Sequence, residues 1–153
     1  MPRAYVGLGA NLGDRAATIA AAVALLASDP EIDVLATSSL RETAPEGPVQ
    51  DQPPFLNGAI ELETTLDPRE LLGRLLAAEA TLGRTREGPV GGPRTIDLDL
   101  LLYGERTLQE PGMTLPHPRL HERRFALEPL AELRSGLEVP GKGSVEALLA
   151  RLD

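Results

Sequence analysis

The stretch "GGPRTIDLDLLLYG", residues 91–104, is an apolar run that carries two acids two positions apart. Its composition predicts a strand, on which residues two apart point to the same side of the sheet. The expected faces are Ile96, Leu98, Leu100 and Leu102 on one side and Asp97, Asp99, Leu101 and Tyr103 on the other. The two carboxylates would then lie roughly 7 Å apart. Their repulsion would cost on the order of 2 kcal/mol at an effective dielectric constant of about 20.

Two interpretations of this acid pair are open from the strand alone. The acids either line a solvated strand face or bind a hard divalent cation such as Mg2+, which two carboxylates and substrate phosphates together can hold. The neighbourhood favours the cation, because Arg84, Arg86, Arg94 and His117 flank the strand in the sequence. Arginine forks bind phosphate oxygens, and phosphoryl transfer depends mainly on positioned cations and metals.

The remaining elements are predicted from the spacing of apolar residues and from Pro and Gly residues at the ends of segments. Strands are expected at 4–9, 32–40, 55–64 and 96–103, a hairpin at 104–113, and helices at 14–29, 67–83, 121–133 and 144–152. Strand, helix, strand, strand, helix, strand is the order of a split β-α-β unit. The sequence therefore predicts an α+β fold, a ferredoxin-like β-α-β-β-α-β sandwich with additional C-terminal helices, as one domain over residues 1–153.

The helix at 67–83 has the clearest start and stop signals in the chain. Asp67 is the expected N-cap, Glu70 completes a capping box, and Gly83 ends the helix. Its expected inward face is Leu72, Leu75, Leu76, Glu79 and Leu82. Glu79 on that apolar stripe either reaches solvent at its edge or faces a cationic partner.

Composition narrows the class of protein. The chain has 153 residues, no Cys and a formal net charge of -8. Such a chain can bury a core without disulfides, has no thiolate chemistry, and lacks the basic excess expected of a nucleic-acid-binding protein. No stretch reaches the roughly 18 apolar residues of a membrane span. We therefore expect a cytoplasmic protein that binds small molecules, with neither nucleic acid nor membrane as a partner.

The glycine-rich stretch "GLGANLG", residues 7–13, suggests a dinucleotide-binding turn at first sight. Its spacing is G-x-G-x-x-x-G, and no acidic residue ends a suitably placed second parallel strand. Close packing at the end of the first strand accounts for Gly7 and Gly9 instead.

Several of these stretches together resemble the 6-hydroxymethyl-7,8-dihydropterin pyrophosphokinase family. The resemblance starts from "GPRTIDLDLLLYG" and extends, in family order and spacing, to "VGLGANLGDR", "ETAPEGPVQDQPPFLNGAIELET", "LLAAEATLGRTR" and "TLPHPRLHERRFALEPLAEL". It implies a ferredoxin-like fold and the transfer of pyrophosphate from ATP to the hydroxymethyl oxygen of the pterin, releasing AMP, in folate biosynthesis.

The resemblance also implies a role for individual positions. Two Mg2+ ions would be held by Asp97 and Asp99, and Arg84 and Arg94 would neutralise charge on the transferred group. ATP would be contacted by Glu79, Arg86, Arg94, His117 and Arg123. The pterin pocket would be lined by Thr43, Ala44, Phe55, Asn57 and Phe125.

One departure from the family pattern concerns the loop before the acid pair. Members often carry an aromatic there, whereas this chain has Gly91 and no Trp. The residues alone leave two rival functions open, a D-x-D transferase that uses a nucleotide sugar and a ligand-sensing module without catalysis. Formation of AMP from ATP would distinguish the pyrophosphokinase from the transferase, and calorimetry with a nonhydrolysable ATP analogue, with and without Mg2+, would distinguish it from the sensing module.

Overall fold

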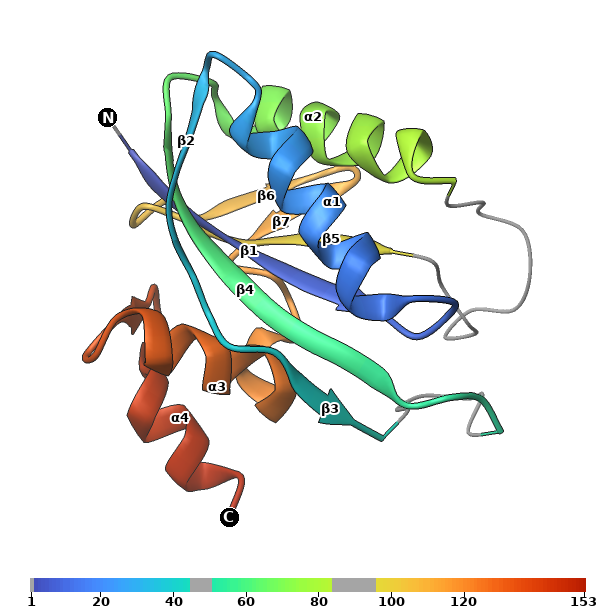
Figure 1. Ribbon diagram of the computed structural model, residues 1–153. Coiled ribbons are helices and arrows are strands. Elements are labelled where there is room, and N and C mark those ends of the chain that lie inside the picture. The colour runs from blue at the N-terminus through green and yellow to red at the C-terminus, as the bar shows by residue number, and fades with distance from the viewer. Residues whose placement is uncertain (1, 45–50, 84–95) are drawn as a thin grey trace.

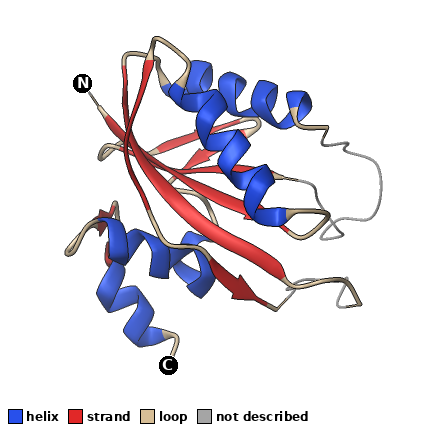
Figure 2. Ribbon diagram, viewed as in Figure 1, coloured by secondary structure: helices blue, strands red, loops and turns tan. Residues whose placement is uncertain are grey.

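The computed structural model describes residues 2–44, 51–83 and 96–153, and its centre is a five-stranded antiparallel sheet with helices on both sides (Figure 1, Figure 2). The helices are α1 (Arg15–Ala27), α2 (Pro68–Thr81), α3 (Arg124–Leu133), α4 (Val145–Arg151) and a short 3-10 turn at Leu120–Glu122. The strands are β1 (Arg3–Ala10), β2 (Ile32–Thr37), β3 (Arg41–Thr43), β4 (Phe55–Thr64), β5 (Asp97–Tyr103), β6 (Leu108–Glu110), β7 (Met113–Leu115), β8 (Glu138–Val139) and β9 (Gly143–Ser144). The expected α+β class is confirmed.

The main sheet has the order β2-β4-β1-β5, with β3 pairing the other end of β4. Each of α1 and α2 therefore connects two strands that have a third strand between them. The strand expected at 32–40 ends earlier, at Thr37, because residues 38–40 leave the ladder, and a separate strand, β3, follows at Arg41–Thr43. This break lets β3 lie beside the start of β4, where Arg41 pairs with Asn57 and Thr43 with Phe55.

Separate apolar clusters cover the two faces of the sheet. On the face of α1 and α2, Val6 and Leu8 of β1 pack with Ile60 and Leu62 of β4. On the opposite face, α3 and α4 pack over residues such as Tyr5 and Ala59. Figure 1 shows α1 and α2 on one side of the sheet and α3 and α4 on the other. The second face also carries the two acids of β5, so it has both an apolar end and a polar end.

A β-bulge in β5 overturns part of the expected strand alternation. The pairing with β1 shifts between Tyr5, which pairs with Leu102, and Val6, which pairs with Leu100. Leu101 is the extra residue, and the alternation reverses after it. Leu102 therefore packs in the cluster under α3 and α4, while Tyr103 packs in the cluster under α1 and α2. The expected faces of Leu102 and Tyr103 were wrong, and those of the residues before the bulge hold.

Helix α2 begins as its sequence predicts. The Asp67 carboxylate accepts the Glu70 N–H at 2.8 Å, and the Glu70 carboxylate accepts the Asp67 N–H at 3.0 Å. Its buried row is Leu71, Leu75, Ala78 and Glu79. Leu76, expected inside, is 41% exposed, because one residue turns the helix by about 100° and Leu75 already points at the sheet.

The C-terminal third begins with the β6–β7 hairpin. It lies a few residues beyond the expected position, and Gly112 in its turn has a φ of 79°. No helix in the described part of the chain is long and apolar enough to cross a membrane.

Candidate functional site

The polar end of the second sheet face is a set of side chains in two rows across three strands. In one row, Gly9 of β1 pairs with Asn57 of β4 on one side and with Asp97 of β5 on the other. In the next row, Gly7 stands between Ala59 and Asp99. Both acids are partly buried on this face. The register thus brings an amide and two carboxylates together with only glycines between them.

Gly7 and Gly9 have no side chains, so the sheet surface between β4 and β5 is flat at these two positions. We call this surface the glycine floor. A Cβ atom built on Gly9 would lie 3.0 Å from Asn57 Nδ2 and 3.9 Å from the Asp97 Cβ. One built on Gly7 would lie 3.3 Å from the Leu101 side chain. Both glycines lie inside β1 and not in a turn. The dinucleotide-turn interpretation is therefore wrong, and close packing explains these positions.

The β4 side of the floor is bordered by residues expected to line a pterin pocket. Thr43 donates a hydrogen bond from its hydroxyl to the Asn57 side-chain oxygen, which leaves the Asn57 amide N–H2 pointing toward Gly9. Phe55 is on the same face of β4 and is partly buried, whereas Ala44 is exposed after the end of β3. Three of the five expected pocket residues therefore lie on adjoining strands, and Ala44 directly follows one of them.

The fifth expected pocket residue belongs to α3. Phe125 is partly buried at the start of this helix, and the Arg123 guanidinium lies over its ring at 5.5 Å from the ring centroid. His117 lies on a segment that docks on β5, where its backbone N–H donates to the Leu101 carbonyl at 3.0 Å. The protein thus places an aromatic ring, a guanidinium and an imidazole beside the acid-bearing strand.

His117 is held neutral at physiological pH. Burial, followed by the positive charge of Arg123, lowers the pKa of His117 from 6.5 to about 4, with an opposing contribution from Asp97. Its Nδ1 accepts the Arg119 backbone N–H at 3.3 Å, so the ring proton belongs on Nε2. His117 is therefore equipped to donate one hydrogen bond and not to act as a cation.

Glu79 reaches the same strand from the opposite face. It is 3% exposed, and its Oε2 accepts the Leu98 backbone N–H, between the two acids, at 2.8 Å. The expectation that it reaches solvent at the edge of the stripe was wrong. Its helix, α2, packs against β5, and the carboxylate accepts the backbone N–H of the residue that lies between the two acids.

Four positions of interest lie outside the described residues. Arg84, Arg86, Gly91 and Arg94 fall within 84–95, so their expected roles stay predictions. Within the described ranges, no group of three or more His, Cys, Asp or Glu side chains could hold a metal ion by itself. A cation at Asp97 and Asp99 would need further oxygen ligands from a substrate or from water.

Several residues that shape this face could not be identified from any sequence pattern. Glu132 of α3 accepts hydrogen bonds from Ser39 and Arg41, more than ninety positions away along the chain. The Ser39 hydroxyl is the main cause that lowers the pKa of Glu132 below its usual value. Only the packing of α3 against β4 brings these segments together, and no local pattern encodes that packing.

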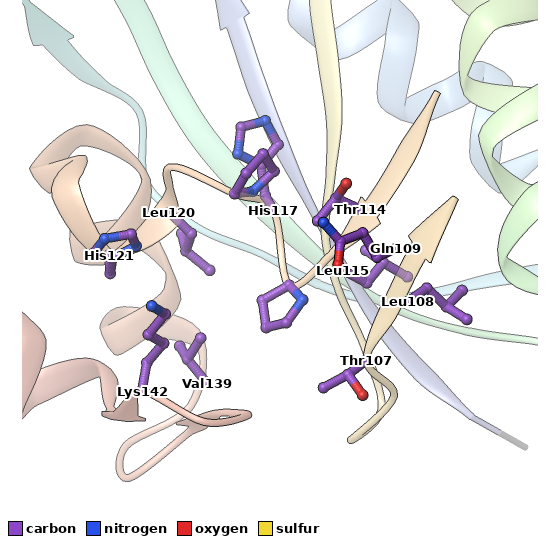
Figure 3. Close-up of a pocket in the computed structure, with 12 residues that line it drawn as sticks. Thr107, Leu108, Gln109, Thr114, Leu115, His117, Leu120, His121, Val139 and Lys142 are labelled. Carbon is purple, nitrogen blue, oxygen red and sulfur yellow. The ribbon is translucent and has the colours of Figure 1, made fainter. Parts of the chain in front are cut away.

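A separate groove of about 500 Å³ lies between the β6–β7 hairpin and the β8–β9 hairpin. Figure 3 shows Gln109 and Thr114 on one side and His121 and Lys142 on the other. His117 contributes to its wall as well. Neither acid of β5 lines this groove, so it is distinct from the polar end of the sheet.

Comparisons with known proteins agree with the motifs. Residues 5–135 match the family model of 7,8-dihydro-6-hydroxymethylpterin-pyrophosphokinase. The chain is 46% identical, over all of its length and 95% of the relative's, to 2-amino-4-hydroxy-6-hydroxymethyldihydropteridine pyrophosphokinase of Methylorubrum extorquens. It is 46% identical, over 88% of its length and 80% of the relative's, to the protein of that name in Bacillus subtilis.

Solved structures show the same fold at lower sequence identity. The crystal structure of Plasmodium falciparum HPPK-DHPS A437G superposes with a TM-score of 0.75 at 14% identity. The match covers 98% of this chain and 45% of that chain. The triple mutant of the same protein gives a TM-score of 0.77 at 15% identity. This chain spans less than half of the length of these two solved chains.

Proposed function

The chain belongs to the 7,8-dihydro-6-hydroxymethylpterin-pyrophosphokinase family, and from that premise we propose which of its residues perform the reaction. It is a transferase of folate biosynthesis that moves pyrophosphate from ATP to the hydroxymethyl group of 6-hydroxymethyl-7,8-dihydropterin. The match over the whole chain carries this conclusion and sets aside the nucleotide-sugar transferase and the ligand-sensing module.

We propose that the pterin occupies the β4 side of the glycine floor. Asn57 and Thr43 supply polar groups for the edge of the ring, and Phe125 supplies an apolar face for stacking. Phe55 and Ala44 border the same space. A flat heterocycle fits because Gly9 has no side chain to lift it from the sheet.

The ATP phosphates occupy the β5 side in this proposal. Asp97 and Asp99 share a face and offer the hard oxygen ligands that suit Mg2+, so the donor set fits two such ions completed by phosphate oxygens and water. Bound there, Mg2+ would neutralise phosphate charge as AMP leaves. Arg123 and Asp97 both act electrostatically on His117, so Arg123 is assigned to the same side, and Arg84, Arg86 and Arg94 complete the cationic side in the proposal. Glu79 would act near the nucleotide by fixing the backbone of Leu98.

The geometry gives the two substrates a defined separation. Asn57 and Asp97 are two strand spacings apart across Gly9, or about 10 Å between their backbones. Phosphoryl-type transfer needs the nucleophile and the phosphorus to be held in line more than it needs covalent help from the protein. The hydroxymethyl oxygen forms a bond to the β-phosphorus, the bond from that phosphorus to the α-phosphate oxygen breaks, and the hydroxyl proton passes to solvent.

His117 has a limited role in this scheme. Because it is neutral with its proton on Nε2, it donates a hydrogen bond to a phosphate oxygen and adds no charge. The positive charge that balances the transferred group then comes from arginines and bound cations.

Three broader assignments belong to the same proposal. The split β-α-β strand order supports a ferredoxin-like class for the sheet. The length of the match supports one pyrophosphokinase domain over residues 1–153. A cytoplasmic location stays a prediction from the sequence.

Calorimetry with a nonhydrolysable ATP analogue tests the placement of the phosphates. We expect affinity to rise with Mg2+ in the wild-type protein and to lose that dependence in Asp97→Ala/Asp99→Ala. Equal affinities with and without Mg2+ in the wild-type protein would remove the acid pair from the metal site.

A further inference from the structure

The two walls of the proposed pterin pocket belong to different parts of the chain. Thr43 and Asn57 lie on β3 and β4, whereas Phe125 lies on α3. The chain joins these elements only through the segments between them, so it does not by itself fix the distance between the two walls. The width of the pocket therefore depends on side-chain contacts between α3 and the β2–β3 segment.

Glu132 makes those contacts with one carboxylate. Its Oε2 accepts the Ser39 backbone N–H at 2.7 Å, and its Oε1 accepts the Ser39 hydroxyl at 2.7 Å and Arg41 Nη2 at 2.9 Å. Glu132 lies about two helical turns after Phe125 on the same helix. One residue thus connects the helix of the aromatic wall to the strand of the polar wall.

Arg41 transmits this contact to the substrate side. It pairs across the ladder with Asn57 and lies two residues before Thr43, so all three share one face of the sheet. Arg41 Nη1 is buried and has no hydrogen-bond partner among the described residues. Glu132 is then the acceptor that orients this guanidinium, and its loss would release Arg41 from its position next to Asn57.

Ser39 transmits the contact to the backbone of β4. The adjoining Ser38 pairs with Ala59, donating its N–H to the Ala59 carbonyl and accepting the Ala59 N–H on Oγ, each at 2.9 Å. Leu40 lies so close to Gly58 that a Cβ atom there would be 2.7 Å from its Cδ2. A shift of Ser39 would therefore move the strand segment that bears Asn57.

Helix α3 has independent anchors, so Glu132 is not needed to keep it folded. Leu127 and Leu130 are fully buried against the sheet. Arg134 Nε donates to Glu61 Oε2 on β4 at 3.2 Å, and the Tyr5 hydroxyl donates to the same carboxylate. Loss of the Glu132 carboxylate should leave the helix in place and free only the β2–β3 segment.

We infer that Glu132 is a positioning residue that sets the spacing between Phe125 and the Thr43–Asn57 pair, and so controls affinity for the pterin substrate. The inference rests on the proposed pterin pocket. Glu132 acts through Ser39 and Arg41 and does not touch the substrate.

Steady-state kinetics on Glu132→Gln, Arg41→Met and the double variant test this role. We expect the pterin KM to rise about tenfold in each single variant, which corresponds to about 1.4 kcal/mol. The double variant should rise by about the same factor and not by their product, because both changes break one contact. The ATP KM and kcat should stay within about twofold of wild type in all of these variants.

Two further variants make the result specific. Glu128→Gln changes a carboxylate one turn earlier on α3 and should leave all constants within about twofold. Ser39→Ala removes only the hydroxyl contact and should raise the pterin KM less than Glu132→Gln does. If Glu132→Gln folds poorly, Ser39→Ala alone tests the proposal, which then requires that its pterin KM rise above the wild-type value.

The proposal is overturned if the pterin KM of Glu132→Gln, or of Ser39→Ala where that variant decides, stays at the wild-type value. It is also overturned if pterin KM, ATP KM and kcat all change in the same proportion, as general loosening of the fold would produce. A failure of the proposed function looks different, because the wild-type protein itself would then form no pterin-dependent AMP.

Discussion

Asn57 of β4 and Asp97 of β5 both pair with Gly9 of β1, so an amide and a carboxylate share one sheet face with only a glycine between them. The arrangement places the proposed pterin contacts and the proposed phosphate contacts in one row. Strand register, which the hydrophobic alternation of β1 and β4 fixes, therefore determines how the two substrates meet.

Gly9→Ala should damage the site without unfolding the protein. The new methyl group would lie 3.0 Å from Asn57 Nδ2, closer than most packed side chains come, so the Asn57 amide would have to shift away from Gly9. We expect the pterin KM to rise about tenfold. Gly73→Ala is the control, since no atom lies within 4 Å of its Cβ and alanine favours the helix. An unchanged pterin KM in Gly9→Ala would show that the floor is not a substrate surface.

The neutral state of His117 can be measured by NMR. Its imidazole should carry the proton on Nε2 at pH 7 and titrate near a pKa of about 4, well below 6.5. The depressed pKa means that the unfolded chain binds this proton first as pH falls. The contribution of His117 to the free energy of unfolding is therefore fully present above pH 6.5 and declines as pH falls toward 4. Between pH 7 and pH 5, the urea midpoint should fall less in His117→Gln than in the wild-type protein. An equal fall in both proteins would contradict the neutral state of His117.

Glu79 should contribute to stability through its acceptor role. Glu79→Ala leaves the Leu98 N–H without that acceptor at a buried position, at a cost of about 1–3 kcal/mol. Glu79→Gln keeps an acceptor oxygen and should cost less. Urea unfolding of both variants measures the difference, and equal losses would show that the hydrogen bond to Leu98 is not what Glu79 contributes.

Strand β5 shows which parts of the site the sequence could predict. Alternation placed Asp97 and Asp99 on one face correctly, because residues before the bulge obey the two-residue period. It misplaced Leu102 and Tyr103, because the extra residue at Leu101 depends on pairing with β1, which no local pattern reveals.

Interactions between residues close in sequence could be predicted in other elements as well, whereas interactions between distant residues could not. The Asp67–Glu70 capping box could be predicted because both partners lie within one turn. Glu132 could not, because its partners approach it only after α3 packs on the sheet. The motifs predicted the family from the sequence, whereas the contacts of Glu132 are visible only in the folded structure.

The protein's two tyrosines should both remain protonated beyond pH 10. Burial is the largest cause that raises the pKa of Tyr5 and of Tyr103. The unfolded chain therefore releases these protons first, and stability is lost as pH rises above 10. Phenolate absorbance near pH 10 should be lower in the folded protein than in urea, where it should be about half developed. A midpoint near 10 under native conditions would contradict the buried Tyr5–Glu61 contact.

The central claim is that this sheet face joins a pterin to ATP phosphates, and one product analysis tests it most directly. The wild-type protein is incubated with ATP, Mg2+ and 6-hydroxymethyl-7,8-dihydropterin, beside Asp97→Asn/Asp99→Asn. We predict equal amounts of AMP and pterin diphosphate from the wild-type protein, no AMP without the pterin, and loss of both products in the variant. Formation of ADP in place of AMP, or an undiminished rate in the variant, would contradict the account.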